Sequence, residues 1–266
     1  MKRIGIVTTE QYKPFQMQII EGIQAVTGQE CELVIDSLGE DPTMRKDFSL
    51  DTRLLDGLIV IADVLADDTI LSLHAEGIPM TLVSHLLDDA RIPSVIQNNI
   101  DGMTQLMNYM IADCQRRNLV FIQGNLAQGD SRERLSLFQA GMMRHDLSPD
   151  DALYIEGNGD PVIAGNAILE LLDSDTSFDG IVASDYLMGC AVLDILRFYN
   201  VRIPRDVSVM AFGDGTEAIE LGLTVVGVNL IDLGQRSARQ LLGQIDGIRF
   251  SGVTWLNTEL IVRDSS

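Results

Sequence analysis

Short apolar runs alternate with amphipathic segments along the whole chain, and this alternation restricts the possible folds more than any other feature. Each run is long enough for one buried strand, and the runs are residues 3–8, 31–36, 57–62, 79–84, 94–97, 118–123, 151–155, 179–184, 207–212 and 224–228. Between them, apolar residues recur at three- and four-residue spacing, as is typical of helices, in residues 15–26, 103–114, 134–145, 162–172 and 230–245. The pattern predicts an α/β fold with parallel sheets, right-handed crossovers and helices on both faces.

The number of predicted strands favours two sheets over one. A single open sheet rarely holds about ten strands comfortably, and a chain of 266 residues is long enough for either one or two domains. We therefore expect two lobes. The polar stretch 37–51, which contains Gly39 and Pro42, predicts a loop that leads into a short helix.

The charge of the chain argues against binding to nucleic acid. Acidic residues outnumber basic residues 39 to 19, which gives a formal net charge of −20. Basic residues are adjacent only in the pairs Lys2–Arg3, Arg45–Lys46 and Arg116–Arg117. A protein that grips a duplex needs clustered Lys and Arg to release counterions, so we expect no duplex affinity from this chain alone.

The sequence contains neither a membrane span nor a secretion signal. No apolar run reaches the ~18 residues that cross a bilayer, and the basic start is followed by only a strand-length apolar run. We therefore expect a cytoplasmic protein with no membrane partner. Cys31, Cys114 and Cys190 are odd in number and widely spaced among apolar residues, which predicts reduced thiols rather than a disulfide.

Motifs of enzymes and cofactor sites are also missing. The chain has no GxSxG, HExxH, CxxC or P-loop, and GNGDPVIAG at residues 157–165 does not have the GxGxxG spacing. The spacing of His74, His85 and His145 to acidic residues and cysteines indicates neither a catalytic triad nor a metal site. We expect a protein that is not an enzyme and that holds no metal and no cofactor.

One segment combines a turn, a strand and a strand end of the kind that binds ligands. In RIPRDVSVMAFGD, residues 202–214, Pro204 and Asp206 mark a turn, an apolar strand follows, and Gly213 and Asp214 end that strand. Ligands of open α/β sheets bind at such strand ends. The segment resembles VPEDVSVIGFDD, a signature of the LacI/GalR family, whose effector-binding core is shared with periplasmic sugar-binding proteins.

Other segments carry the same resemblance in the same order, from Ile4 to Ser265. They are RIGIVTTEQYKPFQMQIIEGI (first strand, NPFF turn and first helix), LDGLIV (VDGIIL), GIPMTLVSH (GIPVVLIDR), NNIDG (DNEAG), SRERLSLF (SSRERLEGF), ASDYLMG (ANDLMALG), LTVVGVNLIDLGQRSARQLL (LTTVRQPLEELGRAAAELLL) and ELIVRDSS (LVVRES).

The resemblance implies two doubly wound parallel-sheet lobes of the periplasmic binding protein-like type I, joined by three crossovers. The crossovers would fall near residues 97–99, 228–230 and 251–255. The N-terminal lobe would then comprise residues 1–98 plus 230–251, and the C-terminal lobe residues 99–229 plus 252–266.

The resemblance also implies a small-molecule sensor that acts by hinge closure. A ligand that touches both lobes favours the closed state, and closure changes a homodimer or a fused output domain, for which ELIVRDSS is a natural junction. Leu71 and Ile78 are predicted contributors to the dimer. We do not expect the DNA-binding headpiece that precedes this core in family repressors. Two alternatives remain open: a sugar-type solute-binding protein of a transporter, and a dimerisation scaffold without a ligand.

The ligand site of such a core lies at strand ends and helix starts between the lobes. The resemblance places there Lys13, Phe15, Gln16, Ser84, His85, Arg134, Asp160, Ser184 and Asp214. Three of these residues could instead have a purely structural role. Phe15 could be ordinary core packing, His85 a solvated or locally bonded side chain, and Arg134 a partner of Asp130 or Glu133 in an ion pair.

Asp160 and Ser184 could equally cap the helices that follow them. Asp214 mostly faces away from the pocket in the family, although the residue itself is retained here. These alternatives stay open at the level of the sequence.

Two positions lack carboxylates that the family uses for its ligand. Ser84 and His85 stand where the family has Asp-Arg, Gly213 replaces an Asp, and Val228 replaces a polar residue. A hydrogen bond from a charged group contributes roughly 1.5–3 kcal/mol, so two missing carboxylates remove roughly 3–6 kcal/mol, or about two to four decades of affinity. We therefore expect a small-molecule effector other than an ordinary hexose, either anionic or sugar-like but less rich in hydroxyls, that faces Lys13, His85 and Arg134 in a locally positive site. A vestigial pocket is the alternative.

Overall fold

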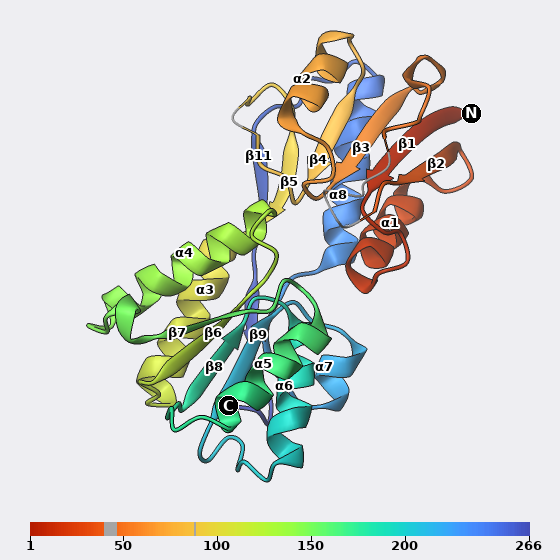
Figure 1. The fold of residues 1–266 in the computed structure, drawn as a ribbon. Helices are drawn as coiled ribbons and strands as arrows, with labels where there is room; N and C mark the ends of the chain where they lie inside the picture. The colour runs from red at the N-terminus through yellow and green to blue at the C-terminus, as the bar shows by residue number, and fades with distance from the viewer. Residues whose placement is uncertain (40–46, 88) are drawn as a thin grey trace. The chain divides into compact units, whose positions relative to one another are not determined.

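The computed structural model describes residues 1–39, 47–87 and 89–266, and these divide into two units (Figure 1). Unit 1 contains residues 1–97 and 229–256, and unit 2 contains residues 98–228 and 257–266. The first two division points lie within one residue of the boundaries expected from the sequence. The third lies after Leu256 instead of residue 251. Part of the predicted loop 37–51 lies outside the described residues, and the short helix expected after it is the 3-10 turn η1 (Thr52–Leu54).

Unit 1 is built on a six-stranded parallel sheet with the strand order β11-β5-β4-β3-β1-β2. The strands are β1 (Lys2–Thr8), β2 (Cys31–Ser37), β3 (Gly57–Ile61), β4 (Met80–Val83), β5 (Ser94–Gln97) and β11 (Val253–Leu256). The helices are α1 (Pro14–Thr27), α2 (Asp67–Ala75) and α8 (Leu230–Ile245).

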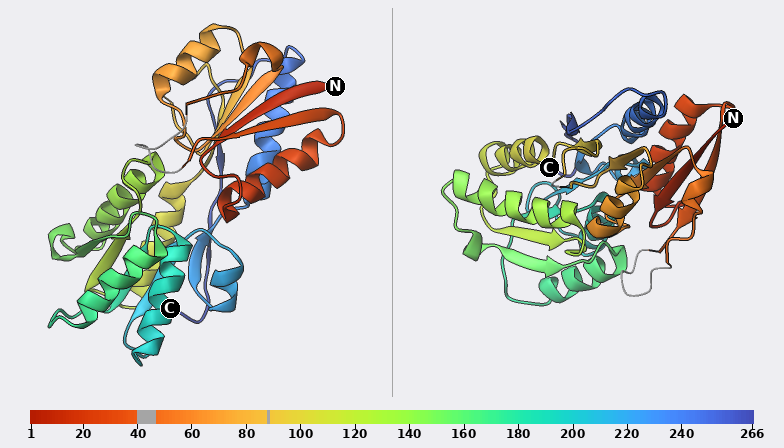
Figure 2. Two further views of the ribbon diagram at one scale, coloured as in Figure 1. Left: turned by 45° about the vertical axis from the view of Figure 1, so that its right-hand side comes forward. Right: turned by 90° about the horizontal axis from the view of Figure 1, so that it is seen from above.

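Alternate residues of the unit 1 strands face different helices. Leu58 and Val60 of β3 lie in one apolar cluster with Ile70 of α2. On the other face, α8 contacts β3, β4 and β5 and packs along α1 (Figure 2). Because both faces of the sheet are covered, its strands are apolar throughout, which is why the sequence shows them as continuous runs.

Unit 2 contains a second six-stranded sheet, in the order β12-β10-β9-β8-β6-β7. Its strands are β6 (Leu119–Gln123), β7 (Leu153–Glu156), β8 (Gly180–Ala183), β9 (Ser208–Phe212), β10 (Thr224–Gly227) and β12 (Glu259–Ile261). Its helical segments are α3 (Asn99–Asn108), the π-helical turn η2 (Tyr109–Asp113), α4 (Gly129–Arg144), the 3-10 turn η3 (Pro149–Asp151), α5 (Pro161–Leu172), α6 (Tyr186–Phe198) and α7 (Thr216–Glu220).

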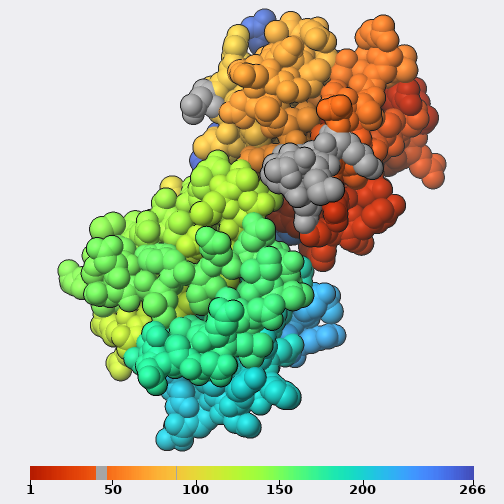
Figure 3. Space-filling model, in the orientation of Figure 1, coloured from red at the N-terminus to blue at the C-terminus, as the bar shows by residue number. Residues whose placement is uncertain are grey.

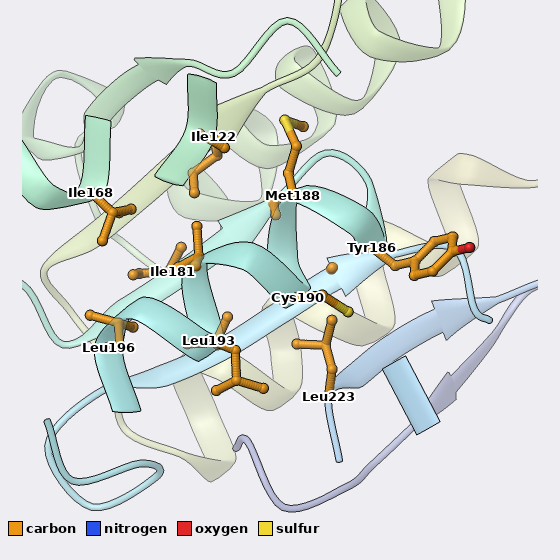
Figure 4. Packing of buried hydrophobic residues seen from close by; sticks show 14 of the residues in the cluster. Ile122, Ile168, Ile181, Tyr186, Met188, Cys190, Leu193, Leu196 and Leu223 are labelled. Atoms are coloured by element: carbon orange, nitrogen blue, oxygen red, sulfur yellow. The ribbon is translucent and has the colours of Figure 1, made fainter. Parts of the chain in front are cut away.

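The two faces of the unit 2 sheet have separate cores. Val120 and Ile122 point to the cluster formed with α5 and α6, which Figure 4 shows from close by. Phe121, on the intervening position of the same strand, packs with Phe138 of α4 and with α3 residues on the opposite face. In the space-filling view, the green to cyan segments of unit 2 form one continuous surface (Figure 3).

Two strands were not expected from the sequence, and they correct two predictions. Val253–Leu256 pairs in parallel with β5 through Val253 and Ser94, so residues 253–256 belong to unit 1 and not to the C-terminal lobe. Glu259–Ile261 pairs with β10 in the antiparallel direction, so the second sheet is not purely parallel. Both are edge strands, and their pairing depends on backbone atoms more than on apolar side chains.

Candidate functional site

Most residues predicted to bind a ligand lie with other polar residues at the carboxyl ends of the strands in each unit. Predicted residues of the unit 1 edge are Lys13, Phe15, Gln16, Ser84 and His85, which begin α1 or follow β4, and Thr8 and Thr9 at the end of β1 join them. Predicted residues of the unit 2 edge are Arg134 and Ser184, and Asn99, Ser131, Tyr186 and Gly213, which begin α3, α4 or α6 or follow β9, join them.

At the unit 1 edge, the start of α1 fixes one predicted residue by a hydrogen bond. Pro14 occupies the first turn of α1, where its missing amide proton costs nothing, and Lys13 is the residue that precedes the helix. Gln16 is buried, and its Nε2 donates to Thr9 Oγ1 at 2.9 Å. Phe15 and Lys13 are half-buried.

Three buried oxygens at this edge have no hydrogen-bond partner. They are Thr8 Oγ1, Gln16 Oε1 and Ser84 Oγ. Thr8 is fully buried and Ser84 is 6% exposed, with a positive φ of 50°. An unsatisfied buried polar group costs about 1–3 kcal/mol, and such groups cluster at functional sites because a ligand can supply the missing partner.

His85 is a locally bonded side chain, which was one of its two structural alternatives. Its Nδ1 lies 2.9 Å from Asp63 Oδ1 and its Nε2 lies 3.1 Å from Asp67 Oδ1, and the imidazole is only 4% exposed. Burial lowers the pKa of His85, but the two carboxylates outweigh it and leave the pKa above its usual value. The imidazole thus joins the loop after β3 to the residue after β4.

At the unit 2 edge, Arg134 is the centre of a hydrogen-bond network. Its Nη1 donates to the Ser184 carbonyl at 2.8 Å, its Nε to Asn99 Oδ1 at 3.2 Å, and its Nη2 pairs with Asp130 at 3.2 Å. The guanidinium carbon lies 4.9 Å from the centre of the Phe212 ring. Asn99 is oriented in turn by Glu133, to which it donates at 2.6 Å. The predicted ion pair of Arg134 with Asp130 is therefore present.

The remaining predicted residues of unit 2 have structural partners. Asp160 caps α5 by accepting the amide protons of Val162 and Ile163. The cap of α6 is Asp185, which accepts from Met188 N at 3.0 Å, so the alternative that gave this cap to Ser184 is wrong.

Asp214 is held within unit 2. Its Oδ2 pairs with Arg263 at 2.7 Å and its Oδ1 accepts from Gly215 N at 3.0 Å. Asp214 therefore contributes to the packing of β9 against the C-terminal segment.

The structure adds Tyr186, which the sequence did not mark. It is the first residue of α6, and its ring lies beside Gly213 and Gly215. Its hydroxyl is buried without a hydrogen-bond partner. Burial raises the pKa of Tyr186 to about 12, so the phenol is neutral. The resemblance gave no signal here, because the corresponding family motif has an apolar residue after Asn-Asp.

Two of the three residues predicted to form a locally positive site, His85 and Arg134, lie beside carboxylates. His85 is bracketed by two carboxylates, and Arg134 faces one. Because these cations are neutralised by neighbours in their own unit, the charge argument for an anionic ligand loses its main premise.

The described residues contain no group of three or more His, Cys, Asp or Glu side chains arranged to hold a metal ion. Within the same part of the chain, no helix is long and apolar enough to cross a membrane.

Comparison with known families identifies the fold. Residues 112–266 match the model of the periplasmic binding protein-like domain. The chain belongs to this family. Among curated relatives, the transcriptional regulator CelR of Thermobifida fusca is 28% identical over 216 residues, which are 79% of this chain and 63% of that protein. The repressor PurR of Vibrio atlanticus is 23% identical over 227 residues, 82% of this chain and 66% of that protein.

Solved structures show the same architecture over the whole chain. A LacI transcriptional regulator from a Rhodococcus species has a TM-score of 0.85 at 22% identity and covers 100% of this chain and 98% of its own. A CelR–cellobiose complex has a TM-score of 0.82 at 24% identity, with 100% and 85% covered. The chain thus has the architecture of the effector-binding core of LacI-type regulators, and it spans just under two thirds of the length of CelR and PurR. The curated relatives are named as regulators of transcription.

Proposed function

We propose that this chain is the effector-binding core of a LacI-type regulator and that its effector is a small, neutral, hydroxyl-bearing molecule. The observation that carries the proposal is the group of buried, unpartnered oxygens of Thr8, Gln16 and Ser84 at the unit 1 edge. Hydroxyl and amide oxygens of this kind match the hydroxyls of a sugar-like ligand, and a vestigial pocket would have no reason to retain their cost.

The electrostatics favour a neutral ligand over the anionic one expected from the sequence. Asp63 and Asp67 stand beside His85, and Asp130 stands beside Arg134. An anion at either edge would meet these carboxylates at short range.

The regulatory step in this proposal is hinge closure. A ligand that bonds to both edges binds the closed arrangement better and shifts the population by that difference in affinity. The closure would alter a homodimer or a covalently joined output domain. Cytoplasmic location and a lack of duplex affinity remain predictions of the sequence.

The dimer contacts predicted from the sequence remain a prediction, because Leu71 and Ile78 are only partly buried. Leu71 and Ile78 pack against the core cluster of unit 1. Exposed apolar side chains occur on both units, and on unit 2 they include Val162, which is 69% exposed, and Ile219, which is 61% exposed. We infer that this surface contacts a second copy, and sedimentation equilibrium of Val162→Asp should show a weaker dimer than the unchanged protein.

Calorimetry and thermal shift with defined probes test the proposed ligand class. Cellobiose, galactose and ONPG represent neutral, hydroxyl-bearing ligands, and glucose 6-phosphate and citrate represent anions. We expect saturable binding within the neutral set, with stabilisation that follows RT ln(1 + [L]/Kd). Tight binding of the anions alone would contradict the proposal.

A matched pair of serine variants assigns the binding to the unit 1 edge. Ser84→Ala removes an unpartnered oxygen, and we expect it to weaken the binding of the best neutral probe about threefold to tenfold. Ser174→Ala is the control, because its hydroxyl donates to the Leu171 carbonyl at the far end of α5. Equal effects of the two variants would argue against a ligand at Ser84.

A further inference from the structure

We propose that Tyr186 is a specificity-determining residue of the effector site, where its phenol ring stands in place of an acidic side chain at the end of β9. The inference rests on the proposed function, because it names the group that the ligand meets at the unit 2 edge. It starts from the two glycines that follow β9 and from the hydroxyl of Tyr186.

Gly213 and Gly215 leave room for the ring. A Cβ atom placed on Gly213 would lie 3.1 Å from Tyr186 Cδ1, and one placed on Gly215 would lie 2.6 Å from the Tyr186 hydroxyl oxygen. Gly213 also has a φ of +85°, which L side chains rarely adopt. An aspartate at 213 and the tyrosine at 186 would therefore compete for the same volume.

The remaining surroundings hold the ring in that place. Tyr186 is 9% exposed and belongs to the apolar cluster of α5, α6 and the strands between them. Figure 4 shows the ring at one end of this cluster, with its hydroxyl directed away from Cys190 and Leu193. The side chain is thus positioned by packing, as a residue that sets the shape of a site must be.

The hydroxyl provides a second and independent observation. It is the one buried side-chain polar atom without a partner among the described residues of unit 2. Other polar side chains at this edge, Arg134 and Asp214 among them, are paired. A ligand atom that reaches the phenol would satisfy it, and because the phenol is neutral it can both donate and accept.

The chemistry of the ligand follows from the replacement of a carboxylate by the phenol of Tyr186. A carboxylate grips two neighbouring hydroxyls of a sugar, whereas a phenol ring offers an apolar wall and one hydrogen-bonding atom. The ligand group at the end of β9 is therefore apolar or aromatic and carries one hydrogen-bonding atom. A sugar with an aromatic substituent fits this description better than a free sugar.

Pairs of probes that differ only in the aromatic substituent test the inference. ONPG against galactose, and 4-nitrophenyl glucoside against glucose, are titrated by calorimetry into the whole chain. In at least one pair, we expect the unchanged protein to prefer the aryl glycoside about tenfold, as stacking and apolar contact on one ring allow. Tyr186→Leu, which keeps apolar volume, should reduce this preference to within about twofold.

The hydroxyl is tested by the variant that keeps the ring. Tyr186→Phe should retain the preference and weaken both members of the pair about threefold to tenfold. Tyr154→Phe is the matched control, since it removes a phenol of the same unit that donates to the Pro149 carbonyl. Melting temperatures of all variants verify that they fold.

The outcomes separate this inference from the proposed function. Saturable binding with a preference below twofold, an unchanged preference in Tyr186→Leu, or a Tyr186→Phe protein that binds like the unchanged one each overturns the role of Tyr186 alone. An absence of binding by every neutral probe contradicts the proposed function, and this inference with it.

Discussion

The two edges differ in how far their polar groups are satisfied by the protein itself. At the unit 2 edge, Arg134 is bonded to three neighbours, and Asp214 is bonded to Arg263. At the unit 1 edge, buried oxygens of Thr8 and Ser84 have no partner. The same architecture therefore carries one edge organised around the Arg134 network, where the Tyr186 hydroxyl is the one buried oxygen without a partner among the described residues, and one edge with several unpartnered oxygens.

This contrast indicates that the two edges would contribute to ligand binding in different ways. A preorganised edge binds without reorganising and sets the shape that a ligand must have. An edge with unsatisfied groups gains more from the ligand, because each bond that forms also removes a desolvation cost of about 1–3 kcal/mol. A preorganised edge would then select a ligand by its shape, and an edge with unsatisfied groups would gain affinity from the bonds that the ligand supplies.

The largest expected effect is the loss of the Arg134 network. We expect Arg134→Ala to reduce the free energy of unfolding by about 3 kcal/mol without any ligand, because it leaves Asp130 and Asn99 without their cationic partner. Urea unfolding followed by circular dichroism measures this. Arg132→Ala, two residues earlier in α4 and exposed, should cost less than about 1 kcal/mol.

Equal costs for the two arginine variants would contradict the preorganisation of the unit 2 edge. The comparison between the edges would then rest on the unit 1 oxygens alone. A larger loss in Arg134→Ala that is confined to ligand binding, with unchanged unfolding, would also argue against a structural network.

The second prediction concerns two buried threonines that differ in their partners. Thr224 Oγ1 accepts from Arg263 N at 2.8 Å and lies 2.7 Å from Ser266 Oγ, whereas Thr8 Oγ1 has no partner. Both residues are fully buried. We expect Thr224→Val to destabilise the protein by about 2 kcal/mol and Thr8→Val to stabilise it by up to about 1 kcal/mol.

The signs of these two changes are the decisive measurement, because the substitution is the same in both. Chemical unfolding of the variants under identical conditions gives both values. A Thr8→Val protein as unstable as Thr224→Val would show that the Thr8 hydroxyl has a partner in solution, and the contrast between the edges would fail.

The sequence could predict the sheets and the location of the edges, because buried strands between helices leave continuous apolar runs such as residues 207–212. It could not predict β11 or β12. These edge strands have only four and three residues, and Trp255 in β11 is 46% exposed, so the burial that marks the central strands is weaker there. The family resemblance also predicted candidate site residues. It indicated where they lie in the chain but not which residues they contact.

What the resemblance could not supply was the set of partners. Asp63 and Asp67 lie 22 and 18 residues before His85, and only the placement of β3 beside β4 brings them to the imidazole. The sequence did not indicate Tyr186 for the same reason, because its role depends on its contact with Gly213 in another loop. Such tertiary contacts determine charge and shape at a site, and they leave no local pattern in the sequence.

The smallest expected effect is a dependence of stability on pH that comes from His85 at the unit 1 edge. The pKa of His85 is raised above its ordinary value of 6.5 by Asp63 and Asp67, in spite of burial. A raised pKa in the folded state means that the stabilisation is complete below pH 6.5 and is lost as the pH rises through the folded value. We expect His85→Gln to cost about 1–2 kcal/mol at pH 5.5 and less at pH 9.

The carboxylates around His85 provide the control for this prediction, because unfolding by urea can be repeated across the same pH range for variants that remove one charge each. Asp63→Asn should flatten the pH dependence, since Asp63 is the nearer partner and is 25% exposed. Asp67→Asn, at a residue 63% exposed, should flatten it less. Asp68→Asn makes the same charge change on the next, exposed residue of α2 and should keep the slope of the unchanged protein.

If Asp68→Asn flattened the curve as much as Asp63→Asn did, the pH dependence would reflect the net charge of the chain and not the His85 contacts. The unit 1 edge would then contain no specific charge pair, and its difference from the Arg134 network of unit 2 would be larger than the structure indicates.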